Sequence, residues 1–146
     1  MKQILARTAL AALLLDLAIK LVPAQGNRVL LPSLLRFHPV RNQGVAFGLL
    51  RGHPLMTLTL TLLIVAIGVF WLRGLRLGRF EEAAAGLMLG GAAGNLIDRA
   101  LHGGVTDYLE LLFVRFPVFN LADVCLVLGA GLMALSLLLP GKAETA

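Results

Sequence analysis

Four apolar stretches, each long enough to cross a lipid bilayer as a helix, constrain this chain more than any other feature. A membrane-spanning helix needs about 20 mostly apolar residues. Of the 146 residues, 58% are hydrophobic and 14% are charged, whereas a soluble domain carries roughly 25% charged residues. We therefore predict one all-α membrane domain over residues 1–146. Its four transmembrane helices are expected at residues 4–22, 54–72, 83–101 and 118–139.

The segments between these stretches differ in length and polarity. Residues 23–53 form a long loop, and the alternation of apolar and polar residues over 40–49 predicts one or two short strands. Residues 73–82 form a short charged turn, and residues 102–117 form a loop of medium length. The expected fold is therefore a helix bundle with a small extracytoplasmic region that contains β-structure.

The ends of the apolar stretches carry further signals. Asp16 and Lys20 interrupt the first stretch, whereas the apolar core of a cleaved signal sequence is normally uncharged. We therefore expect this helix to be retained. Pro54 suits the first turn of a helix, and Pro140 followed by Gly141 suits a helix end.

The basic residues indicate an orientation in the membrane. The chain has 13 basic and 8 acidic residues, and the basic ones are scattered at helix ends, where they can face lipid phosphates. This scatter argues against nucleic-acid binding, which needs a clustered basic face. Four spans place both termini on one side. The arginine-rich turn at 73–82 and the basic N-terminus favour the cytoplasm as that side.

The sequence gives no reason to expect a metal or another cofactor. Cys125 is the only cysteine and lies in an apolar run, which is typical of a buried packing thiol. His38, His53 and His102 do not have the spacing of a zinc site.

A glycine-rich run in the third stretch invites comparison with a phosphate-binding loop. It lacks the Lys-Ser/Thr pair that follows such a loop in nucleotide-binding proteins. Gly90 and Gly94 instead form a face of small residues, which lets membrane helices approach closely. We therefore predict helix packing at this face.

Ionisable residues inside a membrane are energetically costly, so each suggests a function. With the termini inside, most ionisable residues of the apolar stretches are expected toward the outer side of the membrane, namely Asp16, Lys20, Asp98, Arg99 and Asp123. Asp107 lies in the loop that follows the third stretch. Asp16 and Lys20 are four residues apart and can pair on one helix face. Asp98 is also expected to pair with a neighbour.

Asp107 and Asp123 have no basic residue close to them in the sequence. Two such carboxyl groups placed together could share one proton, because like charges at close range cannot both ionise. One would then act as an acid and the other as a base in the hydrolysis of a peptide bond, with no need for a metal or a covalent intermediate. The residues alone leave other interpretations open: a structural polar network, a small proton- or ion-coupled transporter, or a non-catalytic membrane adaptor.

Sequence blocks in the order of the four stretches resemble those of lipoprotein signal peptidase, also called signal peptidase II. The blocks are Asp16-Leu-Ala-Ile-Lys20, Asn42-Gln-Gly44-Val-Ala46-Phe47-Gly48, Gly91-Ala-Ala-Gly94-Asn95-Leu-Ile-Asp98-Arg99 with Gly104-Val105-Thr106-Asp107-Tyr108, and Phe119-Asn120-Leu-Ala122-Asp123. Each block is weak alone, but their shared order makes the resemblance specific.

The resemblance implies a four-helix membrane protease in the bacterial inner membrane, with cytoplasmic termini and a site near the outer face. It assigns the catalytic aspartates to Asp107 and Asp123. The implied substrate is a prolipoprotein that carries a diacylglyceryl group and is cut before the lipidated cysteine. We expect a monomer surrounded by membrane lipids. The substrate-binding or supporting residues would be Asp16, Lys20, Asn42, Gly44, Phe47, Asn95, Asp98, Arg99 and Asn120.

The chain departs from the family pattern at a few positions. Leu17 and Ile19 replace polar residues of the first block, which puts the hydrogen bonding around Asp16 in doubt. Tyr108 stands where the family pattern has phenylalanine. None of these changes falls on the proposed aspartate pair.

Overall fold

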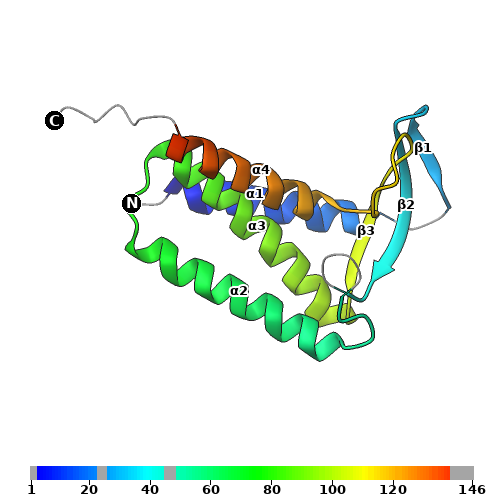
Figure 1. Cartoon of the computed structure of the whole chain (residues 1–146), viewed down its shortest axis with the longest axis horizontal. Helices are drawn as coiled ribbons and strands as arrows, with labels where there is room; N and C mark the ends of the chain where they lie inside the picture. Colours follow the sequence, from blue (N-terminus) through cyan, green and yellow to red (C-terminus); the bar gives the residue numbers. More distant parts are fainter. Residues whose placement is uncertain (1–2, 23–25, 45–48, 139–146) are drawn as a thin grey trace.

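The computed structural model describes residues 3–22, 26–44 and 49–138. Within them the chain forms an elongated helix bundle with a small sheet at one end (Figure 1). The elements, in chain order, are α1 (Gln3–Lys20), β1 (Arg28–Leu31), β2 (Leu35–Asn42), α2 (Pro54–Gly74), α3 (Arg79–His102), β3 (Val105–Leu111) and α4 (Leu121–Leu138).

The predicted helices are all present, but the predicted strands were misplaced. Pro54 lies in the first turn of α2, as expected. The helix α3 begins at Arg79, inside the segment predicted as a turn. The strand expected over 40–49 ends at Asn42, while the loop at 102–117 contains the unforeseen β3. The predicted helix end at Pro140 lies outside the described residues.

The helix α3 is the central element, and α1 and α4 both pack closely against it. A Cβ atom on Gly90 would collide with the carbonyl oxygen of Ala9 in α1, and one on Gly94 would collide with the carboxylate of Asp16. The predicted role of this glycine face in helix packing is thus confirmed. Cys125 is buried in α4, as expected of a packing thiol.

The outer surfaces of α2 and α4 are strongly apolar. Among the described residues, these two helices are long and apolar enough to cross a membrane. In α2, Thr57 is the one buried residue, while Phe70 and Trp71 are 74% and 67% exposed. A bilayer would cover such a surface. For α1 and α3, which carry more charged residues, the transmembrane assignment remains a prediction.

The three strands form an antiparallel sheet in the order β1-β2-β3. In the ladder between β2 and β3, Val40 lies opposite Asp107. The register shifts between Phe37 and Val40, and Pro39, which has no N–H to donate to a ladder, lies within this irregularity. The pairing of two segments far apart in sequence brings the end of β2 beside Asp107.

Two glycines turn the chain sharply from α3 into β3. Gly103 has a φ of 68° and donates its N–H to the carbonyl oxygen of Arg99 at 2.9 Å, a helix ending that favours glycine. At Gly104 a Cβ atom would lie 2.8 Å from the carbonyl oxygen of Asn42. This close approach lets β3 pair with β2 directly after the helix, and it fixes the position of Asp107.

Candidate active site

The predicted site residues that the structure describes gather where α1, α3 and α4 meet the sheet. They are Asp16, Lys20, Asn42, Gly44, Asn95, Asp98, Arg99, Asp107, Asn120 and Asp123, and hydrogen bonds and ion pairs connect them. Phe47, also predicted, lies outside the described residues.

Asp123 is held by the N-terminus of α4. The side-chain oxygen Oδ1 of Asn120 accepts a hydrogen bond from the backbone N–H of Asp123 at 2.9 Å. In return, Oδ2 of Asp123 accepts one from the backbone N–H of Asn120 at 3.2 Å. This reciprocal arrangement is a capping box. It orients the Asp123 carboxylate at a helix end that favours negative charge.

The other free amides at this helix end are also satisfied by side chains. The hydroxyl of Tyr108 in β3 accepts the N–H of Leu121 at 3.0 Å. The carboxylate of Asp16 in α1 accepts the N–H of Ala122 at 3.1 Å. The first amides of a helix lack partners within the helix itself, so these contacts fix α4, and with it Asp123, against two other elements.

Asp107 is 2% exposed in β3. Its carboxyl group accepts hydrogen bonds from the side-chain amides of Asn42 at 3.0 Å and Asn120 at 2.8 Å. Burial raises the pKa of the Asp107 carboxyl to about 6, and the negative charge of Asp123 adds to the rise, while the two asparagine hydrogen bonds oppose it. Asp107 therefore holds a proton more strongly than an ordinary aspartic acid.

Asn95 connects Asp123 to the charged residues of α1. Its amide nitrogen donates to Oδ1 of Asp123 at 2.8 Å, while its oxygen accepts from Nζ of Lys20 at 3.1 Å and from Asn120 at 3.0 Å. Two donors on the oxygen fix which way the amide faces. Lys20 thus orients the group that donates to Asp123.

Asn120 links the two aspartates, since it contacts both carboxyl groups. Among the described ion pairs, none includes Asp107 or Asp123, in agreement with their lack of basic neighbours in the sequence. Arg99 lies near enough for its charge to interact with both. It donates from Nη2 to the carbonyl oxygen of Gly44 at 3.3 Å, and its buried Nε has no partner among the described residues.

Asp98 braces the site through several partners, as its predicted pairing suggested. It lies 3.5 Å from Nζ of Lys20, 2.7 Å from Nδ1 of His102 and 3.4 Å from Nη1 of Arg41. It also accepts the backbone N–H of Thr106. The predicted pair of Lys20 with Asp16 is confirmed at 2.9 Å.

Four of these partners were not predicted from the sequence. His102 follows Asp98 by four residues, a helical spacing that could have identified it. Arg41 and Thr106 reach Asp98 only because β2 pairs with β3, and no local pattern indicates that pairing. The role of the Tyr108 hydroxyl likewise depends on where α4 begins.

The described histidines, cysteine and carboxylates form no group of three or more that could hold a metal ion. The site instead combines two carboxyl groups, one deeply buried and one at a helix end, with amide donors and a nearby guanidinium group. Such a pair can serve as an acid and a base.

Comparisons with known proteins agree with this chemistry. The family model of signal peptidase (SPase) II matches residues 8–139. The lipoprotein signal peptidase of Shouchella clausii is 38% identical over 121 residues, covering 82% of this chain and 80% of that protein. The corresponding enzyme of Halothermothrix orenii is 35% identical over 133 residues, covering 88% and 90%.

Two solved structures resemble the whole fold. Both are described as bacterial membrane enzymes determined by the in meso method. The one at 2.3 Å resolution has a TM-score of 0.82 and 28% identity, covering 96% of this chain and 92% of that one. The one at 1.9 Å has a TM-score of 0.74 and 27% identity, covering 94% and 92%. None of these matches supports the alternative of an ion-coupled transporter.

Proposed function

Because this chain belongs to the signal peptidase II family, an aspartic-type group of bacterial inner-membrane enzymes that remove signal peptides from prolipoproteins, we propose that Asp107 and Asp123 are its catalytic pair. The observation that carries the proposal is the position of Asn120, which holds one carboxyl group with its side chain and the other with its backbone. The substrate is a diacylglyceryl-modified prolipoprotein, cut before the lipidated cysteine.

We infer different roles for the two aspartates from their different environments. Burial raises the pKa of Asp107 to about 6, so Asp107 carries the proton below that pH. Asp123 lies at a helix N-terminus, which stabilises its negative charge. In the first step Asp123 takes a proton from water as the water attacks the peptide carbonyl carbon, and Asp107 protonates the carbonyl oxygen. In the second step Asp123 gives its proton to the leaving nitrogen, and Asp107 recovers one from the gem-diol.

The residues around the pair bind and orient the substrate. Within the described part of the chain the buried Nε of Arg99 has no hydrogen-bond partner, and a guanidinium group can bind a peptide carbonyl. Asn42 and Asn95 hold the aspartates in place. Asp16 and Lys20 position α4 and Asn95 from α1. The assignment of Gly44 and Phe47 to the substrate groove rests on the family resemblance.

The sheet indicates how the molecule sits in the membrane. The edge of an open sheet cannot lie exposed in hydrocarbon, because its backbone groups would lack partners. We therefore place the sheet outside the bilayer, with all four helices crossing it. The helices have 18 to 24 residues, or roughly 27–36 Å at the α-helical rise, which matches the bilayer core.

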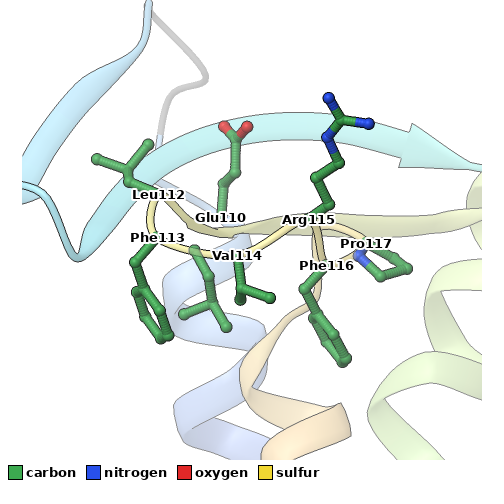
Figure 2. A pocket seen from close by; sticks show the side chains of 8 residues that line it. Glu110, Leu112, Phe113, Val114, Arg115, Phe116 and Pro117 are labelled. Atoms are coloured by element: carbon green, nitrogen blue, oxygen red, sulfur yellow. The ribbon is translucent and has the colours of Figure 1, made fainter.

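The loop at 112–117 suits a position on the membrane surface. It borders an open hollow of about 650 Å³. In Figure 2, Phe113, Val114 and Phe116 point toward the helices, while Glu110 and Arg115 point away. Three apolar side chains thus face lipid and the two charges face water, while Leu112 lies on the same side as Glu110. With α1 beginning and α4 ending away from the sheet (Figure 1), we place the termini in the cytoplasm and the site near the outer face, in a monomer surrounded by lipid.

The proposal can be tested with purified protein in detergent and a diacylglyceryl-modified prolipoprotein. We expect Asp107→Asn and Asp123→Asn each to abolish cleavage while the protein stays folded and membrane-inserted. Glu110→Gln is the control, because Glu110 lies on the same strand as Asp107, is partly exposed and pairs with Arg36. Wild-type cleavage by either aspartate variant would contradict the assignment.

A further inference from the structure

The turn between α2 and α3, at the end of the bundle opposite the sheet (Figure 1), carries arginines at intervals of three residues. They are Arg73, Arg76 and Arg79, and all three are exposed. Within the described residues none of them forms an ion pair or a side-chain hydrogen bond. The Cα atoms of neighbouring arginines are at most about 11 Å apart, even on a fully extended chain. Two guanidinium groups can therefore reach one anion.

The length of α2 places these arginines at the level of lipid phosphates. Arg73 follows Pro54, the first residue of α2, by 19 residues, or about 28 Å at the α-helical rise. The hydrocarbon core of a bilayer is about 30 Å thick. With the sheet outside the bilayer, as proposed above, the turn lies among the headgroups of the inner leaflet. Residues 75–78 alone connect the two helices, so the turn is too short to extend far into the cytoplasm toward a soluble partner.

A hollow of about 580 Å³ adjoins the turn on α2. The residues that border it are Phe70, Trp71, Arg73, Gly74 and Leu75. Tryptophan is typical of the boundary between hydrocarbon and headgroups. Of the described residues that border this hollow, none is acidic. The hollow therefore combines apolar groups at the depth of acyl chains with one positive charge at the depth of phosphates.

A second hollow of about 530 Å³ lies between the turn and the end of α4. Leu75 borders both hollows, so the two adjoin each other, and each includes one arginine. Figure 1 shows that α2 diverges from α3 toward this end, which leaves the bundle open here. The residues that border the second hollow include Arg76, Leu77, Glu81, Met133 and Leu137.

The acidic residues of the turn do not neutralise the first hollow. Glu82 faces α1, where its carboxylate accepts the backbone N–H groups of Ile4 at 3.1 Å and Leu5 at 3.4 Å. Glu81 borders the second hollow but not the first. A zwitterionic headgroup would bring an ammonium group beside the arginines, whereas phosphatidylglycerol brings only a phosphate and hydroxyl groups. The charge of the site therefore favours an anionic phospholipid.

We propose that the α2–α3 turn binds an anionic phospholipid of the inner leaflet. Its phosphate lies between Arg73 and Arg76, and its two acyl chains occupy the two hollows on either side of Leu75. A guanidinium group binds phosphate oxygens through two parallel hydrogen bonds. The bound lipid joins the ends of α2 and α4 where the bundle is open. The proposal uses the membrane placement given above and does not depend on the catalytic pair.

Native mass spectrometry of the purified protein in a neutral detergent can measure this binding. The probes are phosphatidylglycerol and phosphatidylcholine with the same two acyl chains. We expect the wild-type protein to prefer phosphatidylglycerol. Arg73→Gln and Arg76→Gln should each weaken its binding about fivefold, and the double variant should weaken it more than either alone. The affinity for phosphatidylcholine should not change.

Arg51→Gln is the matched control, because Arg51 is also exposed and lies just before the other end of α2. It removes the same charge and should leave phosphatidylglycerol binding unchanged. Glu81→Gln should strengthen this binding, since it removes a negative charge from the second hollow. Should the glutamine variants fail to insert, Arg73→Lys with Arg76→Lys keeps the charges that orient the helices. This pair should weaken binding by less, because lysine cannot form the two-pronged bond.

Three results would overturn the lipid site. The first is equal affinity of the wild-type protein for the two lipids. The second is an equal loss in Arg51→Gln, which would mean that only net charge matters. The third is displacement of the lipid by inorganic phosphate alone, which would mean that the arginines bind a soluble anion. Prolipoprotein cleavage by every variant should stay at the wild-type rate. Wild-type protein that does not cleave would refute the proposed function and leave the lipid site intact.

Discussion

Asn120→Ala is the substitution that most directly probes how the aspartate pair is held. The Asn120 side chain is fully buried. Its oxygen caps α4 by accepting the N–H of Asp123, and its nitrogen donates to Asp107, to Asn95 and to the carbonyl oxygen of Thr106. Removing it leaves these groups without a common partner.

The expected cost to stability has two parts. Loss of a helix N-cap costs about 0.5–2 kcal/mol. Loss of the hydrogen bond to Asp107 leaves a buried polar group without this partner, which costs about 1–3 kcal/mol. Because the same side chain makes both contacts, the parts overlap, and we expect the free energy of unfolding to fall by about 2–4 kcal/mol. Loosening of the reacting groups by about 1 Å would lower kcat about 100-fold.

The pH profile separates a role in catalysis from a role in stability alone. The proposed mechanism needs Asp107 protonated, so we expect activity to fall as pH rises through its pKa, which is about 6 in the free enzyme. The hydrogen bond from Asn120 lowers this pKa. Asn120→Ala should therefore raise it, and the alkaline limb of kcat/KM should move to higher pH.

The same raised pKa affects folding with a defined sign. Asp107 binds its proton more tightly in the folded state than at its ordinary value of 3.8. The stability it contributes is therefore fully present below that value and is lost as pH rises through about 6. In Asn120→Ala this loss should extend to higher pH.

The assay measures cleavage of the lipid-modified substrate in detergent across this pH range, with thermal unfolding followed in parallel. Asn27→Ala is the control, because Asn27 is exposed and lies away from the site. An Asn120→Ala enzyme with an unshifted alkaline limb and wild-type kcat would refute the claim that Asn120 holds the pair.

Two further predictions concern the packing that supports the site. Tyr108→Phe removes the acceptor of the Leu121 N–H and should lower the free energy of unfolding by about 1–3 kcal/mol. Chemical denaturation in detergent measures this change. Unchanged stability would mean that this amide finds another partner. Glu82→Gln replaces a carboxylate that accepts the backbone N–H of Ile4 at the start of α1 by a neutral amide. It should lower the free energy of unfolding by about 0.3–1 kcal/mol and leave kcat unchanged. Glu81→Gln is the matched control and should lower the free energy of unfolding by less.

The sequence predicts the helices well because their signal is local. Each apolar stretch is long enough for a membrane span, and Pro54 marks a helix start by its own chemistry. Asp16 and Lys20 pair at a spacing that any helix imposes. The capping box of α4 is also local, since Asn120 and Asp123 are three residues apart.

The sheet and the hydrogen-bond network of the site could not be predicted from local sequence patterns. The pairing of Val40 with Asp107 joins segments far apart in sequence, and the register shift at Pro39 disturbs the simple alternation that strand prediction uses. The contact between Asp16 and the N–H of Ala122 depends on how α1 and α4 pack around α3. The resemblance to a family predicted that these residues share one site. Only the three-dimensional structure shows which atoms are hydrogen-bonded to one another.

Among the described residues the aspartate pair accepts hydrogen bonds from amides and forms no direct ion pair, which explains how one proton can stay there. Lys20 is buried close to the site, but its ammonium group is engaged by Asp16, Asp98 and the oxygen of Asn95. What reaches the pair from this side is the neutral amide of Asn95. A direct cation would favour ionisation of both carboxyl groups, whereas amide donors orient them without adding a full charge. Burial raises the pKa of Asp107 to about 6, so in the proposed mechanism Asp107 holds the shared proton below that pH.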